Sequence, residues 1–292
     1  MNSAKQHWAV LGIGYMWKMN QSVSFALVIY GVLSAALLAR SVWEADGLID
    51  ALATLGVDPL YDGVSGSLNV AWFDCLLFFL FGMKEPSGAI NEVLMLNIAW
   101  VLLFLLVGFA ACCSAGYKCT LPVALRCGGR KRQALIMLLW LVTVVLLLLA
   151  ELAVIAYIVP AALGVLAQGD ICSLSPYVQL LVGEEVSSLE LADLGLMFVA
   201  NAAWLIAVAL GVAAFCTIAG RPLAMLLLLG LAVGSAYAPT AFPLLDYAMA
   251  ARSAIFGSGL IEPLMSVFIA VVVDAAALLL LVVARMRAEG VL

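Results

Sequence analysis

The chain has 292 residues, of which 66% are hydrophobic and only 11% charged, and its mean hydropathy is +1.19. Soluble domains are nearer half apolar and a quarter charged, so this composition excludes a soluble globular protein, a disordered chain and a disulfide scaffold. The 13 Lys and Arg against 18 Asp and Glu give a net charge of −5, which leaves no basic surplus for binding a nucleic acid. We therefore expect an all-α, polytopic helical membrane protein, with one transmembrane domain over residues 1–292.

An amphipathic stretch comes first and is followed by windows long enough to cross a bilayer. Residues 1–23 are predicted to form an N-terminal amphipathic helix on the inner membrane surface, with Trp8 and Trp17 as interfacial anchors. A span needs about 20 predominantly apolar residues, and Pro160 is expected to end or kink the third span. The six predicted spans are 24–43, 92–114, 134–160, 194–219, 222–241 and 263–284.

Two further apolar segments are not counted as spans. Residues 69–83 would cover only about 22 Å as a helix and carry Asp74, so we expect a short re-entrant or interfacial segment. Residues 241–262 precede the last span, and Pro243 suits the first turn of a helix. Because Leu244, Leu245, Ala248 and Met249 would share one face, 241–262 is predicted to be an amphipathic segment at the outer interface.

The charges favour a topology with six spans and both termini in the cytoplasm. Lys and Arg accumulate in cytoplasmic loops, and residues 118–132 carry five cations and no acid. Acidic residues gather instead in 44–62 and 170–193. With 69–83 not crossing, the basic segments lie inside and both acidic loops lie outside, whereas a seventh span at 69–83 would move the 118–132 cluster outside.

The sequence offers little material for enzyme chemistry. Its only histidine, His7, lies near the N-terminus, which argues against an intramembrane Ser–His protease and against a zinc site built from histidines. No G-x-x-x-x-G-K-[ST] loop is present to hold ATP phosphates. Cys112, Cys113, Cys119 and Cys127 cluster without the usual metal-ligand spacing. We predict no catalytic, cofactor-binding or metal-ligating residues, no cofactor and no enzymatic activity of the chain itself.

Polar side chains inside the apolar windows are the first candidates for a functional site. Glu151 and Asp274 lie near the middle of their windows, where a charge costs about 2.5–3.5 kcal/mol on insertion scales. They can line a substrate path or hold a proton, or they can fix helix packing through a hydrogen bond. Asn97 and Asn201 are uncharged polar residues in the apolar windows, and we expect their amides to form hydrogen bonds that support helix packing.

Small residues recur at four-residue spacing in two of the later windows, where they would let helices approach closely. Ala203, Ala207 and Gly211 form one row, and Gly230 and Gly234 form a G-x-x-x-G pair. Packing within the chain is the ordinary interpretation, and a dimer interface is the alternative.

The inner segment 117–132 carries the most particular pattern. An apolar run leads to a glycine pair and then to a basic entry into the next span, which suits a topology signal, anionic lipid or a protein partner. The stretch Ala124-Leu125-Arg126-Cys127-Gly128-Gly129-Arg130-Lys131 resembles a segment that ABC-2 type transporter permeases carry between their second and third spans. The six predicted spans, the amphipathic N-terminal helix and the basic tail are similar to that family as well.

The resemblance implies a permease subunit that forms the translocation path of an ABC transporter and couples to a separate cytoplasmic ATPase. Residues 117–132 would be a coupling loop seated in the ATPase, and a second permease subunit would complete a homo- or heterodimer in the lipid bilayer. Such a protein would be an exporter in the plasma membrane of a bacterium, with no nucleic-acid partner. The docking residues would be Leu121, Pro122, Leu125, Arg126, Gly128, Gly129, Arg130, Lys131 and Arg132.

Two other functions fit the same residues. A membrane scaffold or sensor subunit would use the basic loop to recruit a cytoplasmic partner without transporting anything. An ion- or proton-coupled carrier would use Glu151 and Asp274 and would need no ATP.

Overall fold

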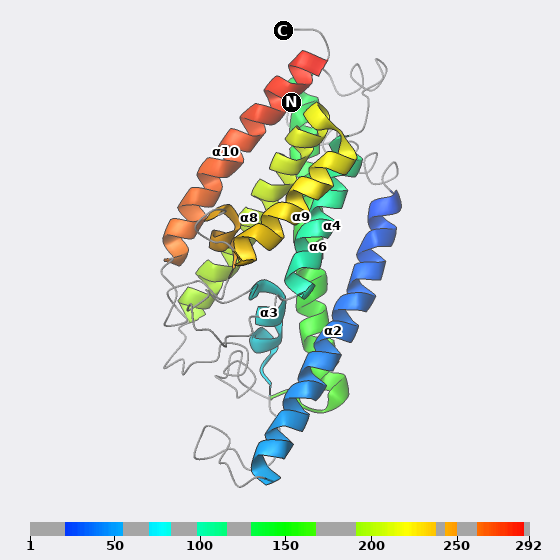
Figure 1. Ribbon diagram of the computed structural model, residues 1–292, viewed down its shortest axis with the longest axis vertical. Helices are drawn as coiled ribbons and strands as arrows, with labels where there is room; N and C mark the ends of the chain where they lie inside the picture. Colours follow the sequence, from blue (N-terminus) through cyan, green and yellow to red (C-terminus); the bar gives the residue numbers. More distant parts are fainter. Residues whose placement is uncertain are drawn as a thin grey trace, which may run out of the picture.

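The computed structural model describes residues 21–54, 70–82, 98–115, 130–167, 191–237, 243–249 and 262–288. Within these ranges the elements are helices, which confirms the all-α class (Figure 1). The α-helices are α2 (Gln21–Thr54), α3 (Trp72–Leu80), α4 (Ile98–Ala115), α6 (Arg130–Leu163), α8 (Leu191–Ala219), α9 (Arg221–Tyr237) and α10 (Pro263–Ala288), and η1 (Pro243–Ala248) is a 3-10 helix.

Five of these helices are long and apolar enough to cross a membrane, so the chain is a multi-pass membrane protein. Their spanning parts are Gln21–Gly47, Ile98–Ala115, Leu135–Leu163, Gly195–Ala219 and Leu264–Ala284. The sixth predicted span, 222–241, corresponds to α9, which has 17 described residues and measures about 26 Å. Its status as a span therefore stays a prediction. Of the predicted N-terminal helix 1–23, only 21–23 lie within the described residues, and they belong to α2.

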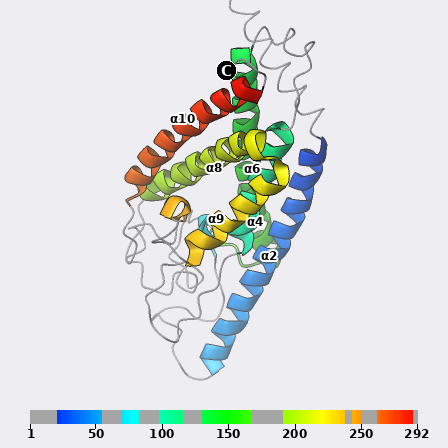
Figure 2. The same cartoon turned by 45° about the horizontal axis from the view of Figure 1, so that its top comes forward.

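The helices α2, α4, α6, α8, α9 and α10 alternate in direction along the bundle (Figures 1 and 2). The start of α2 and the end of α10 consequently lie at the same end of the molecule. A single residue, Gly220, reverses the chain between α8 and α9 with φ at +89°. Its N–H donates to the Cys216 carbonyl at 3.1 Å and its carbonyl accepts from the Ala224 N–H at 3.2 Å. Glycine suits this place because it adopts a positive φ without a steric penalty.

The helix α6 continues past Pro160 to Leu163, so the proline does not end it at once. The end comes one turn later, where Val165 N–H donates to the Pro160 carbonyl at 3.0 Å and Gly164 N–H donates to the Ala161 carbonyl at 3.2 Å. Gly164 has φ at +75°, which completes a Schellman cap. Pro160 has no N–H to donate to the Ala156 carbonyl, so it removes one helical bond, and the helix continues for only three more residues.

The segment predicted at 69–83 forms the short helix α3, whose nine residues cover about 14 Å. That length is too short to cross the hydrocarbon, and most of its side chains are buried against α6 and α4. Two backbone bonds join its entrance to the end of α6: Val70 N–H to the Val165 carbonyl at 2.9 Å, and Ala167 N–H to the Val70 carbonyl at 3.0 Å. Asp74 is buried and accepts from the Ala71 N–H at 3.1 Å, so its carboxyl helps to cap α3.

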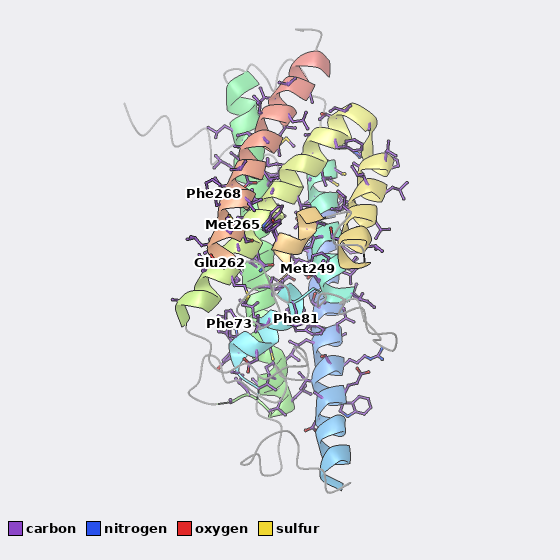
Figure 3. The ribbon with its side chains drawn as sticks, turned by 60° about the vertical axis from the view of Figure 1, so that its left-hand side comes forward. Phe73, Phe81, Met249, Glu262, Met265 and Phe268 are labelled. Carbon is purple, nitrogen blue, oxygen red and sulfur yellow. The ribbon has the colours of Figure 1, made fainter. Side chains whose placement is uncertain are left out.

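The described part of 241–262 packs into the protein. Leu245, Ala248 and Met249 are all buried, and η1 lies against α8 and α9. Met249 reaches the end of α3 (Figure 3), where a Cβ on Gly82 would lie 2.6 Å from its Cγ. The predicted apolar face exists for these three residues, and it covers the bundle.

Tryptophan side chains join the helices by hydrogen bonds from their indole N–H groups. Trp72 of α3 donates to the Ala153 carbonyl of α6 at 2.8 Å, and Trp140 of α6 donates to the Ser114 hydroxyl of α4 at 2.6 Å. Trp204 of α8 donates to the Ser266 hydroxyl of α10 at 3.1 Å. Because these rings also fill space in the core, each forms both a packing contact and a directional bond between two helices.

The Trp140–Ser114 bond can be measured by its removal. Trp140→Phe keeps an aromatic ring in the buried position but leaves the Ser114 hydroxyl without its indole donor. We expect a loss of about 0.6–1.7 kcal/mol of unfolding free energy, the range found for interhelical bonds in membranes. Unfolding of the purified protein in mixed micelles measures this loss. In a Trp140→Phe, Ser114→Ala double variant the two losses should not add, and full additivity would show that the bond contributes nothing.

Candidate functional site

Six of the nine predicted docking residues lie outside the described part of the chain: Leu121, Pro122, Leu125, Arg126, Gly128 and Gly129. The other three, Arg130, Lys131 and Arg132, form the first turn of α6. The apolar part of α6 begins at Leu135, so this basic turn precedes the stretch that fits the hydrocarbon. The predicted docking loop therefore leads straight into a spanning helix.

Glu151 lies between α6 and α2, near the middle of the apolar part of α6. Its carboxyl group rests directly on Gly31 of α2, where a Cβ would overlap the Glu151 Oε1 atom. Glycine at position 31 thus makes the room that the carboxyl group occupies. Within the described residues the carboxyl group has no hydrogen bond or ion pair, and the Glu151 side chain is half-buried.

The face of α2 that meets Glu151 also carries two hydroxyl groups. Tyr30 and Ser34 belong to the buried stripe of this helix, with 4% and 1% of their surface exposed. Neither the Tyr30 hydroxyl nor the Ser34 Oγ has a hydrogen-bond partner among the described residues. The Tyr30 hydroxyl faces the Ser34 hydroxyl at the edge of hydrogen-bond geometry, and it lies within electrostatic range of the Glu151 carboxyl group. Three oxygen-bearing side chains thus meet at one level of the α2–α6 interface.

Asp274 lies on α10, whose closest neighbour is α8. The two helices run in the same direction (Figure 1). The Trp204–Ser266 bond shows that a residue of α8 lies level with the residue of α10 that is 62 positions later in the sequence. This offset places Asp274 at about the level of Val212. One carboxyl oxygen of Asp274, Oδ1, is buried without a hydrogen-bond partner in the described part of the chain. Met265 and Phe268 of α10 are exposed and project outward from the bundle (Figure 3).

The two intramembrane carboxyl groups are not brought together. Glu151 belongs to the α2–α6 pair and Asp274 to the α8–α10 pair, and α2 and α10 lie on opposite flanks of the bundle (Figures 1 and 2). A single site that uses both groups is therefore not formed in this arrangement.

The amide candidates differ in placement. Asn97 lies outside the described residues. Asn201 is buried in α8, and its amide donates to the Met197 carbonyl of the same helix at 3.0 Å. This bond stays within one turn, so it satisfies the amide locally without joining two helices.

The predicted small-residue rows are buried only in part. Ala207 is buried and Ala203 and Gly234 are partly buried, but a Cβ on Gly211 or Gly230 would meet nothing within 4 Å. The close contacts occur instead at Gly31 and at Gly108 of α4, where a Cβ would collide with Leu228 of α9. Gly108 has Phe104 and Cys112 four residues away and does not fit the four-residue pattern, whereas Gly31 and Ala35 form a four-residue pair that the sequence could have offered.

Cysteine chemistry finds no support in the described part of the chain. No three His, Cys, Asp or Glu side chains there come close enough to hold a metal ion, and Cys75, Cys112, Cys113 and Cys216 are free thiols. Burial, with a smaller contribution from the charge of Asp74, raises the pKa of the Cys75 thiol in α3 to about 12. Because the thiolate is the reactive form, Cys75 is a core side chain and not a nucleophile at neutral pH.

Comparisons with known proteins assign neither a family nor a function to this arrangement of residues. No family model, no curated protein and no solved structure matches the chain. The function therefore has to be inferred from the residues and their placement.

The Gly31–Glu151 contact gives a direct test of the interface. Gly31→Ala adds a methyl group where the carboxyl group now lies, and overpacking of this kind costs about 1–3 kcal/mol. We expect this loss in unfolding free energy, and we expect Glu151→Ala in the same chain to restore most of it. Gly47→Ala is the matched control on the same helix, since its Cβ would meet nothing within 4 Å. Equal effects of the two glycine substitutions would contradict the contact.

Proposed function

We propose that the chain is the membrane-spanning subunit of a transporter of the ABC-2 permease type, which docks a separate cytoplasmic ATPase at its basic end. In this proposal α9 is the sixth span, both termini are cytoplasmic, and the protein is an exporter in a bacterial plasma membrane. A second permease subunit would complete the pathway.

The observation that carries the proposal is the separation of charge between the two ends of the bundle. Among the described residues, six of the seven Lys and Arg lie at the end where α2 begins and α10 ends (Figure 1). The seventh, Arg40, is paired with Glu44 at 2.7 Å. The six are Arg130, Lys131, Arg132, Arg221, Arg285 and Arg287.

Acidic residues occupy the opposite end. Glu44, Asp46 and Asp50 lie toward the C-terminal end of α2, Asp193 lies in the first turn of α8, and Glu262 precedes α10. Since basic residues mark the cytoplasmic side of a membrane protein, the basic end faces the cytoplasm. That end is where the predicted docking loop joins α6.

The helix α6 suits the transmission of movement from such a loop. Its 34 residues measure about 51 Å, against about 30 Å of hydrocarbon. It packs against α2, α3, α4 and α8, so a displacement at Arg130 would reach most of the bundle. An ATPase that grips the loop would thus act on the central helix and not on a peripheral one.

Co-purification tests the docking. We expect a stoichiometric ATPase with a nucleotide-binding motif to come with the solubilised protein from native membranes. Replacing Arg130, Lys131 and Arg132 together by Gln should weaken its binding roughly 3- to 150-fold, since each exposed charge pair contributes about 0.2–1 kcal/mol.

Two control variants separate docking from other roles of positive charge. Arg40→Gln, at the other end of the bundle, should leave ATPase binding unchanged, and Arg285→Gln with Arg287→Gln tests whether any loss of basic charge at this end has the same effect. Normal co-purification of the triple variant would overturn docking at this turn. A partner without a nucleotide-binding motif would support the scaffold function instead, and transport that needs no ATP would support a carrier.

A further inference from the structure

The polar group of side chains between α2 and α6 has no explanation in helix packing. It consists of the Glu151 carboxyl group, the Tyr30 hydroxyl and the Ser34 hydroxyl, which we call the Glu151 cluster. Tyr30 and Ser34 are separated by one helical turn, so both hydroxyls point to the same side of α2. Gly31 between them admits the carboxyl group.

The cluster is costly as it stands. An unpaired buried donor or acceptor destabilises the fold, and a charged carboxylate at this depth destabilises it further. The Tyr30 and Ser34 hydroxyls face each other, but neither makes a hydrogen bond of good geometry. A shared partner bound between them would satisfy all three oxygens at once.

No positive side chain in the described part of the chain serves as that partner. Six of the seven Lys and Arg lie at the basic end, and Arg40 is bonded to Glu44. The other acidic groups lie elsewhere: Asp74 accepts a backbone bond at the start of α3, and Asp274 lies on the opposite flank. When ionised, Glu151 would bring one negative charge to this level of the interface.

We propose that the Glu151 cluster binds one monovalent metal cation between α2 and α6. Carboxylate and hydroxyl oxygens are hard ligands that suit hard cations, and a single carboxylate neutralises a single positive charge. A divalent ion would leave a net charge in the low-dielectric interior, which is strongly unfavourable. A proton on Glu151 would also neutralise the carboxylate, and the acid could donate to one hydroxyl and accept from the other, so the experiment below compares sodium with acid alone.

The binding would join two helices that otherwise meet through apolar side chains. Tyr30 and Ser34 belong to α2 and Glu151 to α6, so the occupied cluster would hold these helices together and the empty cluster would let them separate. This property does not depend on the ATPase docking proposed above, and it is tested on the chain purified without any partner.

Sodium ion is the probe. The protein is placed in nanodiscs of neutral lipid, and thermal unfolding is followed in NaCl and in choline chloride at equal ionic strength. We expect the unfolding temperature to rise with NaCl and to saturate, as for a ligand that binds only the folded state. Binding of radioactive sodium should saturate at one ion per chain.

Single-oxygen variants locate the site. Ser34→Ala and Tyr30→Phe each remove one hydroxyl with little change in shape, and each should raise the sodium dissociation constant about tenfold, or 1.4 kcal/mol. Glu151→Gln should abolish both the thermal shift and the radioactive signal. Asp274→Asn, the matched control at similar depth on the other flank, should keep both.

Three results would overturn the proposal. The first is equal unfolding temperature in NaCl and choline chloride with no bound sodium, which would leave water as the occupant. The second is stabilisation by acid alone, which would make Glu151 a protonated group. The third is a sodium response that survives in Ser34→Ala and Tyr30→Phe but disappears in Asp274→Asn. Because the hydroxyl variants are small changes, they keep the test valid even if Glu151→Gln does not fold.

Discussion

Inside a bilayer no water is available to a polar group that loses its protein partner, and the tryptophans of this chain show how the fold meets that constraint. The indole N–H groups of Trp72, Trp140 and Trp204 each find an oxygen on a neighbouring helix. The acceptor is a backbone carbonyl for Trp72 and a serine hydroxyl for Trp140 and Trp204. Each bond fixes the rotation and the height of one helix against another.

The serine acceptors extend this principle beyond pairs of helices. Ser114 receives the Trp140 N–H and donates to the Ala110 carbonyl at 2.8 Å. Ser266 receives the Trp204 N–H and donates to the Tyr247 carbonyl of η1 at 2.7 Å, and the rings of Trp204 and Tyr247 stack with centroids 5.9 Å apart. A small hydroxyl thereby places the 3-10 helix against two spanning helices, which explains why η1 is buried although it is short.

Hydropathy predicted much of this architecture. The long apolar windows became helices near the expected places, and glycine followed the ends of both α6 and α8. Length and hydropathy cannot say what a short apolar segment packs against, so the burial of α3 between α4 and α6 was not predicted. Pro160 was expected to interrupt a helix that in fact ends one turn later, because the cap at Gly164 satisfies the last carbonyls.

The candidate site was predicted in part. The depth of Glu151 follows from counting residues in an apolar window, but its neighbours belong to another helix more than a hundred residues earlier. The 3–4 spacing of Tyr30 and Ser34 with Val23, Leu27 and Leu38 was readable as the buried stripe of α2. What the sequence could not show is that this stripe meets α6 at Glu151, since the pairing of helices depends on shape. The same limit applies to Gly108, whose partner Leu228 lies on a helix far along the chain.

The attachment of α3 also has a consequence for how the protein is made. The entrance of α3 bonds to Val165 and Ala167 beyond the end of α6, and its Trp72 bonds to Ala153, 81 residues later in the chain. During synthesis these partners emerge only after α4 and most of α6 have been translated. The helix α3 therefore enters the membrane before the residues that bond to Val70 and Trp72 have been synthesised. Biogenesis of this bundle cannot proceed strictly from the first helix to the last, and α3 is the place where a slow translation rate or a membrane chaperone would matter most.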